Sequence, residues 1–305
     1  MIKVRPTPDV RYDPAMRKHG LALALSLCVS LVLAAQQSVV RTADPAKRGL
    51  KDSDFPRLIK VAENVYTYED FHAGAEKFTT TDLIVVGPDG VLIADAQGSV
   101  AQTKGLVDAI AKLTPAPIKW VVIASDHGDH TAGNSALPSG ATYFIHPVSK
   151  ATLDASSAGG RGGAGWKLPA DAKLVTDKVT MTVGKEPVEI LFLGGAHTGG
   201  DLSVWLPAKK ILFLSETYLN RVFPAMRSAS PDWLPSLDKA IAMKADLYIA
   251  GHGFTEDGPV SREEVGEYRK ALAYVIAEAT RLKKAGVPVE DAVKQANWGP
   301  YATWT

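Results

Sequence analysis

Three predominantly apolar runs in this 305-residue chain each end a few residues before a histidine. Short runs of this kind are typical of buried strands. They are 120–124, followed by His127 and His130, 188–193, followed by His197, and 247–250, followed by His252. Because a scaffold presents functional side chains where its strands end, we expect these four rings to meet at one site.

The remaining pattern predicts two groups of strands with helices after each group. The turn G-P-D-G at 87–90 predicts a hairpin, and an S-x-x-E capping box at Ser261 and Glu264 predicts a helix start. This order favours an α/β fold in which two sheets pack face to face with helices outside. The expected strands are 65–68, 81–86, 91–94, 120–124, 142–145, 179–183, 188–193, 202–206, 210–214 and 247–250, and the expected helices are 100–113, 232–244 and 261–284.

Composition places the chain among ordinary globular proteins. Hydrophobic residues make up 46% and charged residues 22% of the chain. The formal net charge of +1 gives no electrostatic footprint for nucleic acid. No linker divides the chain after residue 58, so we expect a single domain at 58–305, preceded by a loose polar lead-in at 36–57.

The first 35 residues are typical of an export signal. Arg17, Lys18 and His19 precede an apolar run at 21–35 that ends in small residues. That run is short for a membrane span, which needs about 20 residues, although a retained anchor stays an alternative. We therefore expect a signal peptide with an N-terminal extension at 1–35, initiation at Met16, and a periplasmic or secreted protein without stable membrane insertion. The only cysteine of the chain lies inside the apolar run.

The segment 124–134, which reads A-S-D-H-G-D-H-T-A-G-N, carries most of the chemical information. His127, Asp129 and His130 offer nitrogen and oxygen ligands suited to zinc, and the two glycines permit tight turns. Taken alone, the segment could also be a polar loop with solvated histidines.

The wider order of motifs resembles the metallo-β-lactamase superfamily, which carries H-x-H-x-D-H, then x-G-G-N, a distant His, a Gly-Asp and a Gly-His-Gly. The resemblance spans roughly residues 58–255 and implies a four-layer αββα sandwich of two mixed sheets with outer helices and a site at one edge. The matching segments are I-A-D at 93–95, D-H-T-A-G-N at 129–134, G-A-H-T-G-G-D at 195–201, L-F-L-S-E at 212–216 and G-H-G at 251–253.

Two positions depart from the family pattern. Aligning Asp129 and His130 with the D-H pair puts Ser125 where the first motif histidine stands. Serine is a poor zinc ligand beside imidazole. Glu216 stands where the family has its later aspartate, and it reaches one methylene further.

The resemblance therefore implies two unequal metal sites. One would use Asp129, His130 and His252, and the other His127, His197 and the weak ligand Ser125, with Glu216 between them. Three protein ligands and an open position are usual for a catalytic zinc. We expect one firmly held Zn²⁺ and a second that is weaker or conditional.

The implied activity is hydrolysis by metal-activated water, with Asp129 as the catalytic residue that orients the nucleophile and assists proton transfer. Expected substrates are small esters, thioesters, lactones or β-lactam-like molecules, since one fold hosts many chemistries. The alternative is a non-hydrolytic metal-binding accessory protein with a decayed site. An oxygen-consuming iron enzyme is a further alternative, and it would depend on the site that Ser125 weakens.

Further candidates are less specific. His72, Asn220 and Arg221 are candidate substrate-binding residues, and Arg221 would suit a carboxylate. His146 follows a strand and is better explained as a structural residue. The glycine-rich segment 155–165 is a surface loop or a mobile lid.

Overall fold

The computed structural model describes residues 40–72, 77–156, 166–226 and 229–305. The predicted export signal and most of the glycine-rich segment lie outside the described residues, so those predictions stay open. Residues 41–305 form one compact unit. No helix within the described ranges is long and apolar enough to cross a membrane.

The first sheet has seven strands whose spatial order follows the chain. Its first four strands are antiparallel neighbours, and its last three run parallel to β4. The predicted hairpin is confirmed, with Val86 opposite Val91. The strands are β1 (Arg57–Ala62), β2 (Val65–Phe71), β3 (Thr79–Val86), β4 (Val91–Ala94), β5 (Ile118–Ile123), β6 (Thr142–Ile145) and β7 (Lys173–Leu174).

The second sheet has five strands in the order β12-β11-β10-β9-β8. All its neighbours are antiparallel except β11 and β12, which run parallel. Both sheets are therefore mixed, as expected. The strands are β8 (Lys178–Val183), β9 (Glu186–Leu191), β10 (Ser203–Leu206), β11 (Ile211–Phe213) and β12 (Leu247–Ile249).

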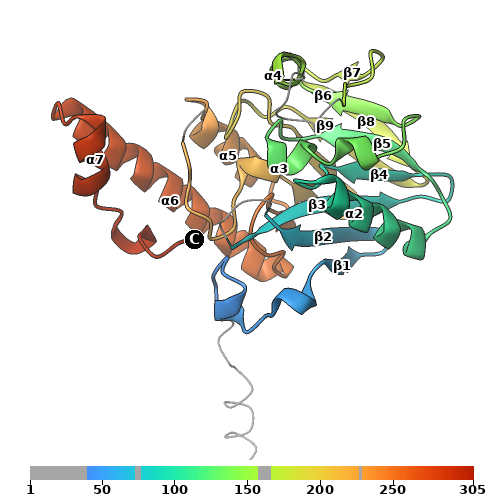
Figure 1. Cartoon of the computed structure of the whole chain (residues 1–305), viewed down its shortest axis with the longest axis horizontal. Coiled ribbons are helices and arrows are strands. Elements are labelled where there is room, and N and C mark those ends of the chain that lie inside the picture. Colours follow the sequence, from blue (N-terminus) through green and yellow to red (C-terminus); the bar gives the residue numbers. More distant parts are fainter. Residues whose placement is uncertain (1–39, 73–76, 157–165, 227–228) are drawn as a thin grey trace, which may run out of the picture. The chain divides into compact units, whose positions relative to one another are not determined.

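Helices cover the outer face of each sheet, which completes the four-layer sandwich (Figure 1). Ser99 caps α2, where its hydroxyl accepts from the Gln102 amide at 3.3 Å. The helices are α2 (Val100–Leu113), α3 (Gly128–Thr131), α4 (Pro147–Ser156), α5 (Trp233–Ala242), α6 (Gly258–Lys284) and α7 (Val289–Gln295), with 3₁₀ turns η1 (Ala46–Arg48), η2 (Asp52–Asp54), η3 (Asn134–Ala136), η4 (Ser215–Thr217) and η5 (Gly299–Tyr301).

Alternation along the strands builds the layers. On β3, Leu83 and Val85 join the cluster between the sheets, whereas Ile84 packs outward beside Leu106 of α2. Strands buried on both faces need apolar residues at every position, which explains their continuous apolar runs. On the second sheet, Tyr248 packs outward in a cluster with residues of α5 and α6.

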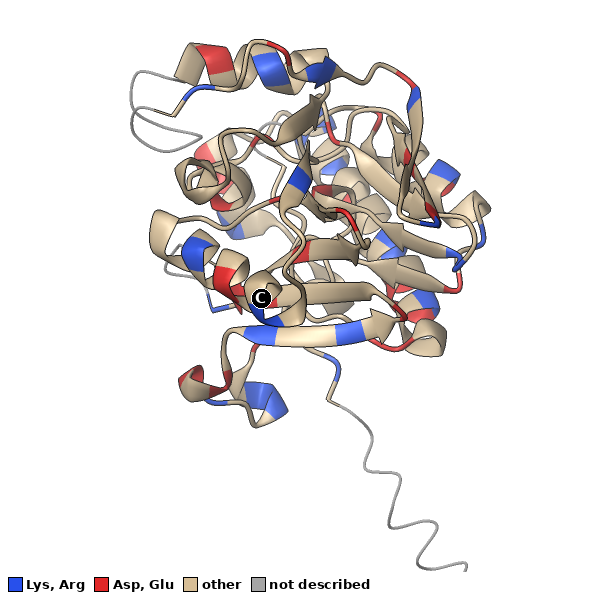
Figure 2. Ribbon diagram, turned by 90° about the vertical axis from the view of Figure 1, so that its right-hand side faces the viewer, with Lys and Arg blue, Asp and Glu red and all other residues tan. Residues whose placement is uncertain are grey.

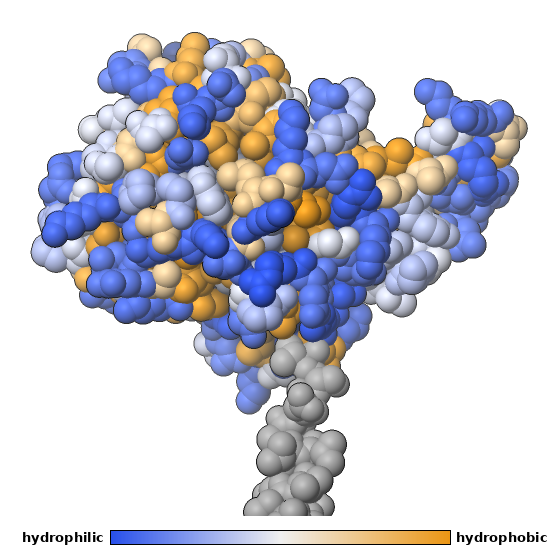
Figure 3. All heavy atoms as spheres, turned by 180° about the vertical axis from the view of Figure 1, so that it is seen from behind, coloured by the Kyte–Doolittle hydropathy of each residue, from blue (hydrophilic) through white to orange (hydrophobic). Residues whose placement is uncertain are grey.

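The surface that results is mixed in character. Lys and Arg are interspersed with Asp and Glu over the ribbon in Figure 2. Hydrophilic and apolar residues are also interspersed in Figure 3. Two exposed valines, Val289 and Val293, stand one turn apart on α7.

Two local expectations were wrong. Helix α6 begins at Gly258, and Asp257 caps it by accepting from the Val260 amide at 3.0 Å. The Ser261–Glu264 capping box therefore does not form, because both residues lie inside the helix. The described part of the lead-in, from residue 40, is not loose either, since Arg41 and Arg48 form ion pairs with acidic residues of α6 and of the loop before it.

Candidate metal centre

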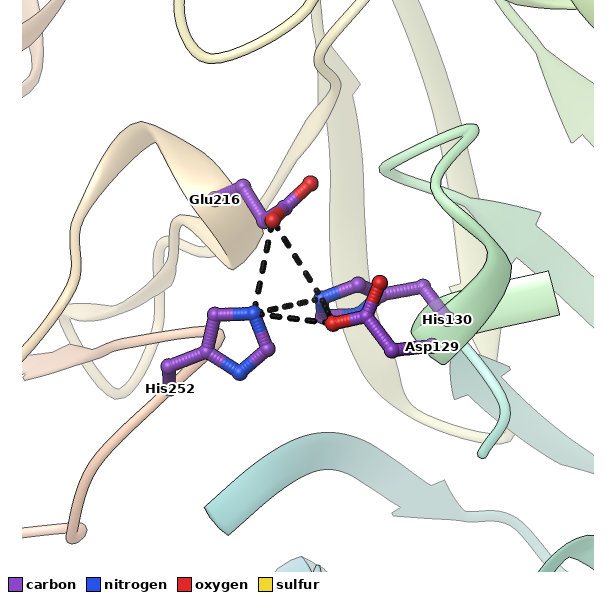
Figure 4. Close-up of side chains that lie close together, drawn as sticks. All are labelled: Asp129, His130, Glu216 and His252. Atoms are coloured by element: carbon purple, nitrogen blue, oxygen red, sulfur yellow. Dashed lines mark hydrogen bonds and ion pairs between the residues drawn. The ribbon is translucent and has the colours of Figure 1, made fainter. Parts of the chain in front are cut away.

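Loops that follow β5, β9, β11 and β12 bring the predicted ligands to one edge of the sandwich, with His197 in the loop after β9. Asp129 and His130 lie on α3, just after β5, and His127 immediately precedes that helix. Glu216 lies in η4 after β11, and His252 follows β12. Figure 4 shows Asp129, His130, Glu216 and His252 pointing toward a common centre.

The first ligand set consists of Asp129, His130, Glu216 and His252. The Nε2 atoms of His130 and His252 lie 3.3 Å apart. His252 Nε2 is also 3.1 Å from Asp129 Oδ2 and 3.3 Å from Glu216 Oε1. One potential ligand atom from each residue lies within 4.8 Å of the others, close enough for one ion to contact all four.

The second ligand set consists of His127, His197 and Glu216. His127 Nδ1 lies 2.9 Å from Glu216 Oε2, and His197 Nε2 lies 3.4 Å from Glu216 Oε1. The ring of Trp233 on α5 packs edge-on against His197, with centroids 5.0 Å apart. Glu216 therefore belongs to both sets, and its Oε1 lies within 3.4 Å of His127 and of His197.

Neighbouring acceptors fix how two of the rings present their nitrogens. His130 Nδ1 lies 3.1 Å from Asp95 Oδ2, and His252 Nδ1 lies 3.0 Å from the Thr79 carbonyl oxygen. An acceptor at Nδ1 holds the ring proton there and turns the Nε2 lone pair toward the ligand position. Two imidazole lone pairs then converge with the carboxylates of Asp129 and Glu216. Such a set of acceptors fits a divalent cation.

Burial and neighbouring charges shift the pKa values of the carboxylates and histidines in the centre. Burial would raise the pKa of Glu216 and of Asp129, but the surrounding histidines hold both well below their usual range. Burial would lower the pKa of His130, yet Asp129 and Asp95 raise it to about 10. The same balance raises the pKa of His252 to about 9. Protons on these rings balance the buried carboxylates, and a bound cation would displace them.

Ser125 makes a contact that the sequence did not reveal. Its side chain is fully buried, and its Oγ donates a hydrogen bond to Glu216 Oε2. The same Oγ accepts from the His127 amide at 3.2 Å. The interpretation of Ser125 as a weak ligand missed this bond to Glu216.

Asp95 joins the loops from both sheets. Its Oδ1 accepts from the Ala124 amide at 2.7 Å and from the Ser125 amide at 3.2 Å. Its Oδ2 accepts from Ser215 Oγ in η4 and faces His130. The end of β5 and the start of η4 are therefore held by one buried carboxylate.

The candidate substrate residues have different surroundings. His72 stacks on Phe78, and its Nε2 lies 3.3 Å from Asp129 Oδ2, at the rim of the first ligand set. Arg221 instead donates two hydrogen bonds to Glu264. The guanidinium of Arg221 is therefore engaged by Glu264, and a contact between Arg221 and a substrate stays a prediction.

Asn220 and His146 are also engaged elsewhere. The Asn220 amide donates to the Phe254 carbonyl at 2.7 Å. His146 stacks on Phe192 and belongs to neither ligand set. Asp126, the carboxylate next to His127 in the chain, also belongs to neither set.

The sequence of this chain is similar to those of known hydrolases over most of its length. The chain is 25% identical over 217 residues to the metallo-β-lactamase type 2 of Bacteroides fragilis, covering 68% of this chain and 83% of that protein. It is 26% identical over 225 residues to a hydroxyacylglutathione hydrolase of Brucella anthropi, covering 70% and 81%. No family model matches the chain.

Solved structures share the fold. A metallo-β-lactamase from Pontibacter korlensis superposes with a TM-score of 0.59 at 21% identity, covering 69% of this chain and 95% of that one. The DIM-1 metallo-β-lactamase gives a TM-score of 0.57 at 23% identity, covering 71% and 97%. The two sheets and their outer helices are therefore shared with these enzymes.

Proposed function

We propose that this chain is a member of the metallo-β-lactamase superfamily and, within it, an exported, zinc-dependent hydrolase of small acyl substrates. The observation that carries the proposal is the convergence of two ligand sets on Glu216. Imidazole and carboxylate ligands without a thiolate suit zinc among the common metals.

The ligand sets support one firmly held ion and a second conditional one. Asp129, His130 and His252 are three ligands that need no help from the altered positions. The other set has two histidines of its own and depends on Glu216 for a third ligand. When bound, Zn²⁺ supplies a Lewis acid and lowers the pKa of a coordinated water from 15.7 to about 7.

The protein's own groups divide the remaining work. The Asp129 carboxylate is 15% exposed, whereas Glu216 is 2% exposed. Asp129 is therefore the carboxylate that can reach a substrate, orient the attacking water and pass a proton to the leaving group. His72, beside Asp129 at the rim, is placed to contact the substrate.

The substrate class follows from this chemistry and from the relatives. One relative is a β-lactamase and another is a hydroxyacylglutathione hydrolase, which supports testing β-lactams and thioesters together with esters and lactones. The net charge of +1 and the interspersed surface charges in Figure 2 do not favour a nucleic-acid substrate.

The test is turnover of this panel by the zinc-loaded protein, before and after a chelator. We expect chelator-sensitive hydrolysis of at least one substrate, restored by zinc. His130→Ala should abolish turnover, whereas His146→Ala, a histidine outside both sets, should retain it. A zinc-replete protein inactive on every substrate would instead favour the accessory-protein alternative.

Export is a separate part of the proposal and has its own test. The basic and apolar pattern of residues 17–35 supports cleavage near residue 35. We expect N-terminal sequencing of the protein from its native cells to begin shortly after that residue, in the periplasmic or secreted fraction. A cytoplasmic protein that begins at Met1 or Met16 would refute export without affecting the hydrolase proposal.

A further inference from the structure

Both oxygens of Glu216 are engaged, and their neighbours differ. Oε2 accepts from Ser125 Oγ and lies 2.9 Å from His127 Nδ1. Oε1 lies 3.3 Å from His252 Nε2 and 3.4 Å from His197 Nε2. His127 Nδ1 is the one neighbour shared by both oxygens among these, since it also lies 3.2 Å from Oε1. The orientation of this one carboxylate therefore decides which oxygen each ligand set receives.

The backbone that carries Glu216 has no room to adjust. A Cβ at Gly251 would lie 2.5 Å from the Ser215 carbonyl carbon and 2.9 Å from the Glu216 nitrogen. The Gly251 amide also donates to the Ser215 carbonyl at 2.8 Å, and Ser215 Oγ is held by Asp95. Because Gly251 and Asp95 hold η4 in this position, we expect a change of side-chain length at position 216 to move the carboxylate more than the backbone.

The backbone that carries Ser125 is held as firmly. Its amide donates to Asp95 Oδ1 at 3.2 Å, and its Oγ accepts from the His127 amide. A serine hydroxyl has a single hydrogen to donate, and here that hydrogen goes to Glu216. The hydroxyl cannot turn toward another acceptor without leaving a buried carboxylate oxygen short of a donor.

The side chains of Ser125 and Glu216 share one limited buried volume. An imidazole at position 125 would extend into the volume that the Glu216 carboxylate occupies, because the two side chains are in hydrogen-bond contact in a buried site. An aspartate at position 216 would end about 1.5 Å short of the present carboxylate and lose the Ser125 bond. A larger side chain at one position therefore requires a smaller one at the other.

We propose that Ser125 and Glu216 form one compensated pair, in which Ser125 binds no metal and positions Glu216 to complete the His127–His197 ligand set. The inference rests on the proposed metal-dependent function. The completed set has two imidazoles and one carboxylate, which is enough for a catalytic zinc with an open position. The departure at position 125 then does not destroy a metal site, because Glu216 supplies the missing ligand.

The first experiment separates positioning from ligation. Metal-free protein is titrated with Zn²⁺ against a chromophoric chelator, and with Co²⁺ by visible absorption, to give the affinity of each equivalent. Ser125→Ala should lower the affinity for the second equivalent of metal by about 10- to 100-fold, as loss of a supporting hydrogen bond does, and leave the affinity for the first equivalent nearly unchanged. Ser125→Thr, which keeps the hydroxyl, should retain most of the second affinity. An unchanged second equivalent in Ser125→Ala would overturn the inference.

The second experiment tests the compensation with a double-mutant cycle. Ser125→His and Glu216→Asp should each lower the affinity for the second equivalent of metal. The double variant should bind this equivalent at least tenfold more tightly than either single variant. The first-equivalent affinity reports in each variant that the centre is folded. Additive losses, or a stronger second site in Ser125→His alone, would contradict the pairing.

The outcomes also separate this inference from the proposed function. If the unaltered protein takes up no zinc, the hydrolase proposal fails. If it takes up one equivalent and no second even at millimolar metal, the pairing fails while a one-metal hydrolase stands. If it binds two equivalents whose affinities are the same in every variant at position 125, the positioning role of Ser125 is refuted while the hydrolase proposal stands.

Discussion

Replacing Asp95 with asparagine tests how the centre presents His130. In Asp95→Asn one oxygen can still accept from the Ala124 and Ser125 amides, which lie 2.7 and 3.2 Å from Oδ1. The new amide group would then face His130 Nδ1, where Oδ2 now lies at 3.1 Å. Because an amide donates, His130 would move its proton to Nε2 and turn a donor toward the ligand position.

The expected cost concerns metal affinity more than folding. Loss of a partner that orients a ligand lowers metal affinity by about 10- to 100-fold, or about 1.4–2.8 kcal/mol. Asp95→Ala is a poorer test, since it removes the acceptor of three buried donors at about 1–3 kcal/mol each and the ion-pair partner of His130, a loss comparable with the whole stability of a domain.

The assay is the zinc titration of the first equivalent, read beside thermal unfolding of the metal-free protein. Asp201→Asn is the matched control, because Asp201 is equally buried and its Oδ2 accepts from the Ala196 and Thr198 amides at 3.0 and 2.9 Å. We expect the control to keep the first-equivalent affinity. First-equivalent binding in Asp95→Asn equal to that of the unaltered protein would refute the orienting role of Asp95.

Three further changes have defined outcomes. Burial raises the pKa of Asp82 from 3.8 to about 8, so between these values the folded state keeps a proton that the unfolded state releases, and the free energy of unfolding falls as pH rises. The stability advantage of Asp82→Asn over the unaltered protein should therefore grow from pH 4 to pH 8 and stay constant above pH 8. A difference in urea titrations that does not depend on pH would contradict this. Arg221→Met should lower the free energy of unfolding by about 1–3 kcal/mol, because buried Glu264 loses a donor, and leave zinc affinity unchanged. His72→Phe keeps the stack on Phe78 but removes the contact with Asp129; kcat/KM should fall about tenfold at unchanged metal content, and unaltered kinetics would remove His72 from the substrate site.

Much of the fold could be predicted because its strands are buried on both faces. The apolar runs before His127 and His252 correspond to β5 and β12, and the turn at 87–90 joins β3 to β4. The edge strand β1 was missed, since its exposed positions break the apolar pattern. The α6 start was misplaced because the capping-box pattern does not reveal that Asp257, four residues before Ser261, caps the helix.

The ligand positions could be predicted, but their supporting contacts could not. Strand ends indicate which loops meet, so the four histidines were expected at one site, whereas Glu216 was placed beside them only by the resemblance to the family pattern. The structure brings these side chains together. The bond from Ser125 to Glu216 joins residues 91 positions apart, and that from His252 to the Thr79 carbonyl joins residues 173 apart. Such contacts depend on the register of the sheets and on a backbone oxygen that no side-chain pattern marks.

The origin of the ligands in both sheets has a consequence for folding. An ion that joins His130 to His252 closes a stretch of chain 122 residues long, because these rings follow β5 of one sheet and β12 of the other. A covalent bridge that closes a loop of about 100 residues lowers the entropy of the unfolded chain and so raises its free energy by roughly 4.7 kcal/mol. The ion would thus act as a reversible cross-link between the halves of the sandwich, and the lifetime of the folded protein would depend on how much zinc surrounds it.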